Sequence, residues 1–82
     1  MEERFIITPY GDNCKYLCFR IGDHNFYEYD KAETLPKGTY ELIFLSQKEA
    51  VEFIQRYNLQ EKYHSQKMWV NPEFHKDVFF EK

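Results

Sequence analysis

GTYELIFLSQKEAVEFIQRYN, the stretch from Gly38 to Asn58, predicts a strand that leads directly into a helix, and the rest of the fold is organised around this pair. Alternate residues of a strand point to opposite faces of a sheet. Between Tyr40 and Leu45 both faces are apolar, and Glu41 is the one polar residue. This pattern is typical of a strand that lies inside a sheet and is covered on both sides.

The helix of this pair carries a start signal and a stop signal. Ser46 is followed three residues later by Glu49, which fits a capping box in which the serine hydroxyl accepts from the Glu49 amide. Apolar residues then recur at helical spacing along one face. Asn58 suits the left-handed backbone conformation in which many helices end. We therefore predict a helix over about 46–58.

Segments on both sides of the pair also have the composition of strands. Ahead of it, three segments rich in aromatic and branched residues are separated by turn signals. They are Arg4–Tyr10, Lys15–Ile21 and Phe26–Lys31. After the helix, the polar stretch Gln60–Lys67 is interpreted as a loop or a helical turn, and Met68–Val70 is a short apolar run. Asp77–Glu81 is interpreted as a final strand or as an extended tail packed on the sheet.

These elements predict a two-layer α+β fold. An antiparallel meander of about four strands is covered by one helix and followed by one or two short C-terminal strands. Hairpin connections make the strand order 1-2-3-4 the simplest. The alternative is that the chain after the helix inserts a strand beside Tyr40–Leu45. The length predicts a single small domain, 1–82, whose thin core argues against a deep cofactor pocket.

Charge and composition exclude several classes of protein. The formal net charge is -3, whereas non-specific nucleic-acid binding relies on clustered Lys and Arg. No apolar run approaches the ~20 residues that span a membrane, and the first residues do not form a signal peptide, so we expect a cytoplasmic protein. Residues with AT-rich codons, such as Phe, Tyr, Ile and Lys, outnumber Gly, Ala, Arg and Pro, which indicates a low-GC bacterium or its phage.

The residues able to carry chemistry are few and poorly placed. Cys14 and Cys18 would lie about 13 Å apart on one strand, too far for a disulfide, which predicts two reduced thiols. Glu73, His75 and Asp77 would share one side of an extended segment at spacings of ~6.5–7 Å, which favours a solvated face over a metal or acid–base cluster. We predict no cofactor, no metal site and no enzymatic activity.

The remaining candidates form a predicted binding surface. On 15–21, Leu17, Phe19 and Ile21 form a uniformly apolar core face, which leaves the opposite face to solvent or a partner. Tyrosines on the next strand are expected to continue the core and to leave the carboxylates between them exposed beside Arg20. Trp69 is either an anchor on a partner or a seal of the core under the helix. The predicted partner-binding residues are Tyr16, Arg20, Glu28, Asp30 and Trp69.

This surface favours a non-enzymatic protein-binding domain. The mixture of aromatics and carboxylates suits a basic groove on a larger protein, such as a nucleic-acid enzyme. The narrower interpretation is a phage or mobile-element inhibitor that blocks a host defence enzyme, and an immunity protein or antitoxin is an alternative. A second alternative is a single-stranded nucleic-acid-binding domain that stacks bases on Tyr16 and on Tyr27 or Tyr29. Under the binding interpretation, Tyr16→Ala and Arg20→Glu disturb binding and leave the fold intact.

Overall fold

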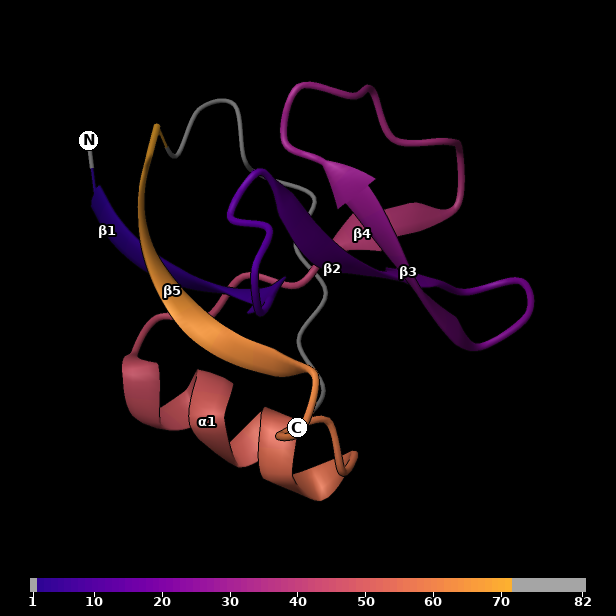
Figure 1. Cartoon of the computed structure of the whole chain (residues 1–82). Coiled ribbons are helices and arrows are strands. Elements are labelled where there is room, and N and C mark those ends of the chain that lie inside the picture. The colour runs from indigo at the N-terminus through magenta and orange to yellow at the C-terminus, as the bar shows by residue number, and fades with distance from the viewer. Residues whose placement is uncertain (1, 72–82) are drawn as a thin grey trace.

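The predicted α+β class is confirmed in the computed structural model, which describes residues 2–71 (Figure 1). Antiparallel strands form two small sheets, and one helix lies against them. The elements are β1 (Glu2–Pro9), β2 (Lys15–Arg20), β3 (Asn25–Asp30), β4 (Thr39–Glu41), α1 (Gln47–Arg56) and β5 (Tyr63–Val70). The predicted segment Asp77–Glu81 and the Glu73, His75 and Asp77 group lie outside the described residues.

Helix α1 begins and ends where the sequence predicts. The Ser46 side chain accepts a hydrogen bond from the backbone N–H of Glu49 at 3.2 Å. At the other end Asn58 has a φ of 56°, and the next amide, of Leu59, donates to the Ile54 carbonyl at 2.9 Å. The left-handed residue therefore turns the chain out of the helix and satisfies one of the last carbonyls.

The order of the strands differs from the predicted 1-2-3-4 meander. β2 lies between β3 and β4 in one sheet, and β1 pairs with β5 in the other. Phe5 and Phe44 also exchange two backbone hydrogen bonds of 2.9 and 2.8 Å, so β1 lies between β5 and the segment that follows β4. Ile6 and Ile7 point to opposite faces of β1 and are both fully buried, which explains why this strand takes an interior position.

β5 includes polar residues that we interpreted as a loop or helical turn. Its polar side chains are satisfied by other elements: Thr8 Oγ1 lies 3.1 Å from His64 Nε2, and Lys31 Nζ donates to Gln66 Oε1 at 2.9 Å. Because strand preference depends mainly on the partner strand and the covered face, a polar stretch beside β1 forms a strand despite its composition.

The core consists of two clusters on opposite faces of the sheets. Helix α1 covers the first face, and the Leu35 side chain from the loop after β3 packs on the second. The first cluster is Ile7, Leu17, Leu42, Phe44, Ala50, Phe53, Ile54 and Tyr63. The second is Ile6, Tyr16, Cys18 and Ile43. We call these sides of the β3–β2–β4 sheet the helix face and the far face.

Candidate protein-binding surfaces

An arginine and two tyrosines of the far face form a connected polar group at the end of the β2–β3 hairpin. Arg20 Nη2 donates to the Tyr29 hydroxyl at 2.9 Å, and the Arg20 Cζ atom lies 4.1 Å from the centroid of the Tyr27 ring. The Tyr27 hydroxyl donates to Asp23, whose carboxylate lies 3.8 Å from Arg20 Nη1. We call Arg20, Asp23, Tyr27 and Tyr29 the arginine–tyrosine cluster.

The turn between β2 and β3 builds this cluster. Arg20 pairs with Asn25 in the register, so alternate residues of the two strands bring the arginine to the same face as Tyr27 and Tyr29. Asp23 in the turn accepts from the Asn25 amide at 3.2 Å, which fixes the carboxylate beside Tyr27. The hydrogen bond from Tyr27 lowers the pKa of Asp23 below its ordinary value, so the carboxylate stays ionised at neutral pH.

Tyr16 was expected on an exposed face, and that expectation is wrong. Its side chain is 3% exposed, and Cys18 on the same face is fully buried, because the second core cluster covers this part of the sheet. The Tyr16 hydroxyl donates to Glu41 Oε1 at 2.8 Å. Burial and this hydrogen bond raise the pKa of Tyr16, so the phenol remains a neutral donor. Tyr16 is therefore a core residue with little surface to offer a partner.

Glu28 and Asp30 do not lie beside Arg20, contrary to our expectation. The register places them on the helix face, whereas Arg20 belongs to the far face with the tyrosines. Glu28 Oε2 accepts from the Tyr63 hydroxyl at 2.7 Å, and Asp30 Oδ1 accepts from the Ala32 amide at 2.9 Å in the turn after β3. Both carboxylates thus connect parts of the fold.

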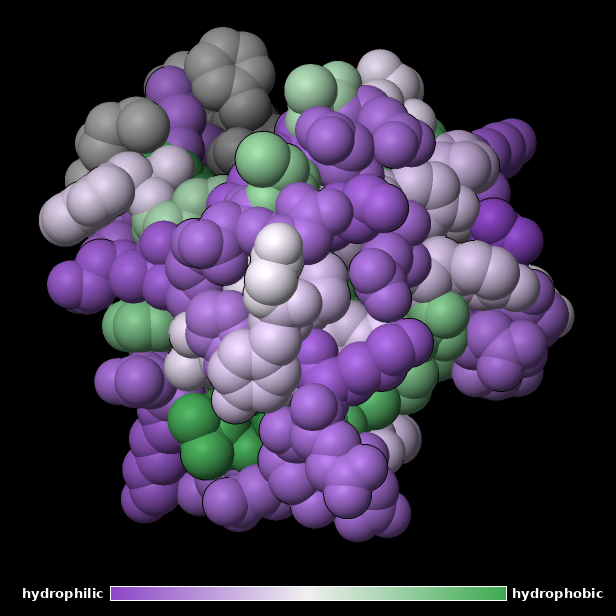
Figure 2. Space-filling model, viewed as in Figure 1, coloured by the Kyte–Doolittle hydropathy of each residue, from purple (hydrophilic) through white to green (hydrophobic). Residues whose placement is uncertain are grey.

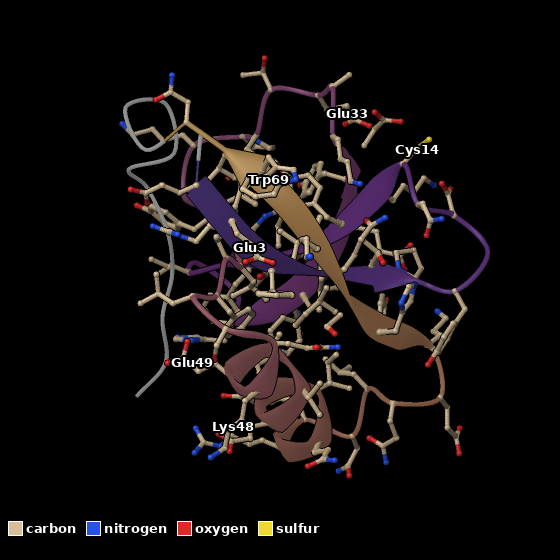
Figure 3. All side chains as sticks on the ribbon, turned by 90° about the vertical axis from the view of Figure 1, so that its left-hand side faces the viewer. Glu3, Cys14, Glu33, Lys48, Glu49 and Trp69 are labelled. Carbon is tan, nitrogen blue, oxygen red and sulfur yellow. The ribbon has the colours of Figure 1, made fainter. Side chains whose placement is uncertain are left out.

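Trp69 lies on the surface and does not seal the core under the helix. Its side chain is 59% exposed near the end of β5, opposite Glu3 of β1. Figure 3 shows both side chains on the same side of the molecule as Lys48 and Glu49 of α1. Lys67 Nζ forms an ion pair with Glu3 Oε1 at 3.1 Å. We call Glu3, Lys67 and Trp69 the tryptophan surface.

The predicted partner-binding residues therefore do not form one site. Arg20 lies at the β2–β3 turn and Trp69 near the end of β5, and these parts of the two sheets are at opposite sides of the molecule in Figure 1. Sequence reasoning considered Tyr27 and Tyr29 either as core residues or as base-stacking residues, and did not identify Asp23, Glu3 or Lys67 as parts of a site. The four-residue turn from 21 to 24 is the sequence feature that could have predicted the cluster. It sets the register of β2 and β3, and this register brings Arg20 to the tyrosines.

Exposed apolar residues are scattered over the rest of the surface. In Figure 2, hydrophilic side chains cover most of the visible face and hydrophobic residues appear as small separate areas. Single exposed apolar residues are ordinary on protein surfaces. Among residues 2–71, the exposed large apolar residues are Tyr10, Ile21, Leu45 and Trp69. Trp69 differs from the others in having the largest apolar side chain and an ion pair beside it.

His64 is the described histidine with a well-defined polar partner. Its ring stacks on Tyr10 with a centroid distance of 4.6 Å, and its Nε2 lies 3.1 Å from the Thr8 hydroxyl. Thr8 is fully buried, so a substrate could not reach that hydroxyl. The pair therefore connects β1 and β5 and does not supply a nucleophile. Across residues 2–71, no group of three or more His, Cys, Asp or Glu side chains could hold a metal ion.

The comparisons with known proteins do not identify this small α+β domain. No family model, curated protein or solved structure matches the chain. Within the part of the chain that the structure describes, there is no helix of the length and apolar character needed to cross a bilayer. The functional argument therefore rests on the side chains of the two surfaces described above.

The two cysteines are expected to react at very different rates. Cys14 is exposed and Cys18 is buried, and burial raises the pKa of the Cys18 thiol to about 12. In the native protein one thiol per chain should react quickly with Ellman's reagent, and the second should react only after unfolding. Cys14→Ser should abolish the fast reaction and Cys18→Ala should retain it. Two equally fast native thiols would contradict the burial of Cys18.

Stability is expected to fall at alkaline pH. Burial raises the pKa of Cys18 from an ordinary value of 9.0 to about 12, and burial with the Glu28 hydrogen bond raises that of Tyr63 from 10.0 to about 12. A raised folded-state pKa stabilises the native state fully below the ordinary value, and this contribution is lost as pH rises toward the folded value. Thermal melts should therefore show a decreasing Tm between pH 9 and 12.

The variants Cys18→Ala and Tyr63→Phe separate the two contributions. Each removes one titrating group, so each variant should lose less Tm over this pH range than the wild type does. A wild-type Tm that stays constant across the range would contradict the burial of both groups. Cys14→Ser is the matched control, because it also replaces a cysteine but at an exposed position.

Proposed function

We propose that this chain is a non-enzymatic protein-binding domain and that Trp69 is its anchor. The observation that carries the proposal is a tryptophan side chain that is 59% exposed beside the Glu3–Lys67 ion pair. Tryptophan is enriched among the residues that contribute most to protein–protein binding. An apolar centre bordered by charged groups is also the usual arrangement of such interfaces.

Burial and stacking of the tyrosines favour a protein partner over single-stranded nucleic acid. Base stacking needs an open ring face next to cations. Tyr16 is buried, and Arg20 already lies over the Tyr27 ring, with Asp23 next to both. A negatively charged group at this position disfavours a phosphate backbone.

The chemistry of the partner is less restricted than the sequence suggested. A basic groove was inferred from carboxylates that share a face with Arg20, and Glu28 and Asp30 lie on the opposite face. The proposal therefore retains a protein partner without a basic groove. A phage or mobile-element inhibitor of a host defence enzyme, an immunity protein and an antitoxin are narrower forms of it. All are cytoplasmic roles, and the identity of the partner decides between them.

The test is affinity capture with two matched variants. The tagged chain, Trp69→Ala and Tyr10→Ala are each immobilised and exposed to a nuclease-treated lysate of the source cell. Tyr10 is 60% exposed and lies beyond Pro9, at the other end of the β1–β5 pair from Trp69. One stoichiometric protein should remain on the wild type and Tyr10→Ala after washing at about 0.5 M salt, and be absent from Trp69→Ala.

Two outcomes would overturn the proposal. Capture of nucleic acid alone from a parallel untreated lysate, lost after nuclease treatment or at high salt, would assign the chain to nucleic-acid binding. Capture of the same protein by Trp69→Ala would show that another surface makes the contact.

A further inference from the structure

The guanidinium of Arg20 holds unused hydrogen-bonding capacity. An arginine side chain has five N–H donors. Among the described residues, Arg20 makes one hydrogen bond, to Tyr29, and one ion pair, to Asp23 at 3.8 Å. The Asp23 carboxylate is beyond hydrogen-bonding distance of the guanidinium. The Arg20 side chain is 36% exposed, so the remaining donors are within reach of a ligand.

The same guanidinium is already held in one orientation. The Tyr27 ring lies against its face, and the Tyr29 hydroxyl accepts from one edge. Binding normally requires a flexible arginine to lose side-chain entropy, and a group that is ordered in advance loses less. The Tyr27 hydroxyl in turn donates to Asp23, so each member of the arginine–tyrosine cluster contacts another member.

We propose that Arg20 binds the carboxylate of an Asp or Glu side chain on the protein partner, an inference that rests on the proposed function. This contact is separate from that of Trp69, which lies on the other side of the molecule, so the partner reaches both sides of the domain. A carboxylate presents two oxygens at the spacing of two parallel guanidinium N–H groups. The fitting ligand is therefore an acidic side chain.

The charges around Arg20 favour an isolated carboxylate over a nucleic acid. Asp23 and Glu41 lie on the same face of the sheet, and the net charge of the chain is -3. A single carboxylate adds one negative charge beside these acidic groups, and the free N–H groups of Arg20 can pair with it. A nucleic acid brings an unbroken series of phosphates, which these acidic groups repel.

Solution NMR tests this proposal without knowledge of the partner. The Nε–Hε signals of the three arginines are recorded during titration with a blocked peptide of Glu and Leu residues, a blocked peptide of Gln and Leu residues, and single-stranded oligo-dT. The Arg20 signal is assigned from its loss in Arg20→Lys. Arg4 and Arg56 serve as internal controls in the same spectrum. The Glu–Leu peptide should shift the Arg20 signal saturably, with a shift at least about threefold larger than those of the other two.

Two results would overturn the inference. Equal shifts of all three arginines would show non-specific charge attraction. A larger response of Arg20 to oligo-dT than to the Glu–Leu peptide would assign the site to phosphate. Arg20→Lys keeps the charge and loses the planar fork, so about tenfold weaker binding of the captured partner is expected for it. Arg56→Lys is the matched control and should bind as the wild type does.

The inference and the proposed function can fail separately. A saturable Arg20 response to the peptide, together with capture of no protein from the lysate, would retain the carboxylate site and overturn the binding function. Capture of a protein that Arg20→Lys binds as tightly as the wild type does would retain the binding function and overturn the carboxylate site. Backbone spectra of Arg20→Met, which keeps an unbranched side chain against Tyr27, would show that any loss does not come from unfolding.

Discussion

Tyr16→Ala is expected to lower the free energy of unfolding by about 3–5 kcal/mol, the range seen when a buried aromatic side chain is removed from a core. Tyr16 is 3% exposed and belongs to the second core cluster, and its hydroxyl donates to Glu41 at 2.8 Å. Native domains are stable by roughly 0.05–0.15 kcal/mol per residue. The substitution should therefore remove much of the stability of this chain.

Urea unfolding at neutral pH measures the effect, and two variants control for it. Tyr16→Phe retains the ring and loses the hydrogen bond to Glu41, which should cost about 1 kcal/mol. Tyr10→Ala removes a tyrosine of the same size that is 60% exposed and stacks on His64, and should cost only about 1 kcal/mol. If Tyr16→Ala were as stable as Tyr10→Ala, the burial of this face of β2 would be wrong, and the sequence-based expectation of an exposed Tyr16 would be right.

The elements that could be predicted from the sequence are those that depend on local chemistry. The Ser46 cap and the residue that ends α1 are determined by short-range hydrogen bonds. The predicted interior strand from Tyr40 to Leu45 is wrong in its extent: β4 covers only Thr39–Glu41 at the edge of its sheet, and Phe44 forms a single bridge to β1. The strand segments 15–20 and 25–30 follow from composition and from the turn between them.

The pairing of distant segments could not be predicted in the same way. β1 pairs with β5, which is more than fifty residues away, and the polar residues from 63 to 67 give no local sign of this strand. The error at Tyr16 has the same origin. A uniformly apolar set at Leu17 and Phe19 marks one core face, but the opposite face is buried by β1, Ile43 and Leu35, whose positions depend on tertiary packing.

The same difference between local chemistry and the pairing of distant segments applies to the candidate surfaces. Residue type alone indicates that Arg20 and Trp69 are suited to contact a partner. The position of Arg20 over Tyr27 depends on the hairpin register. The exposure of Trp69 beside Glu3 depends on the β1–β5 pairing. Glu28 and Asp30 belong to neither surface, because strand alternation places them on the helix face.

Trp69→Ala should weaken binding of the captured partner by about 30- to 1,000-fold, the equivalent of roughly 2–4 kcal/mol for the loss of a central aromatic anchor. The same substitution should change the free energy of unfolding by about 0.5 kcal/mol or less, because the side chain is 59% exposed in the free protein. An anchor and a core residue differ in this respect, since the anchor becomes buried only in the complex.

Calorimetric titration of the purified partner, with urea unfolding of each variant, measures the two quantities separately. Trp69→Phe retains part of the apolar area and should bind with intermediate affinity, whereas Tyr10→Ala should bind within about twofold of the wild type. A loss of more than about 2 kcal/mol of stability in Trp69→Ala would show that the ring packs on the fold. The ring would then have a structural role in the free protein, and the tryptophan surface would not be the interface.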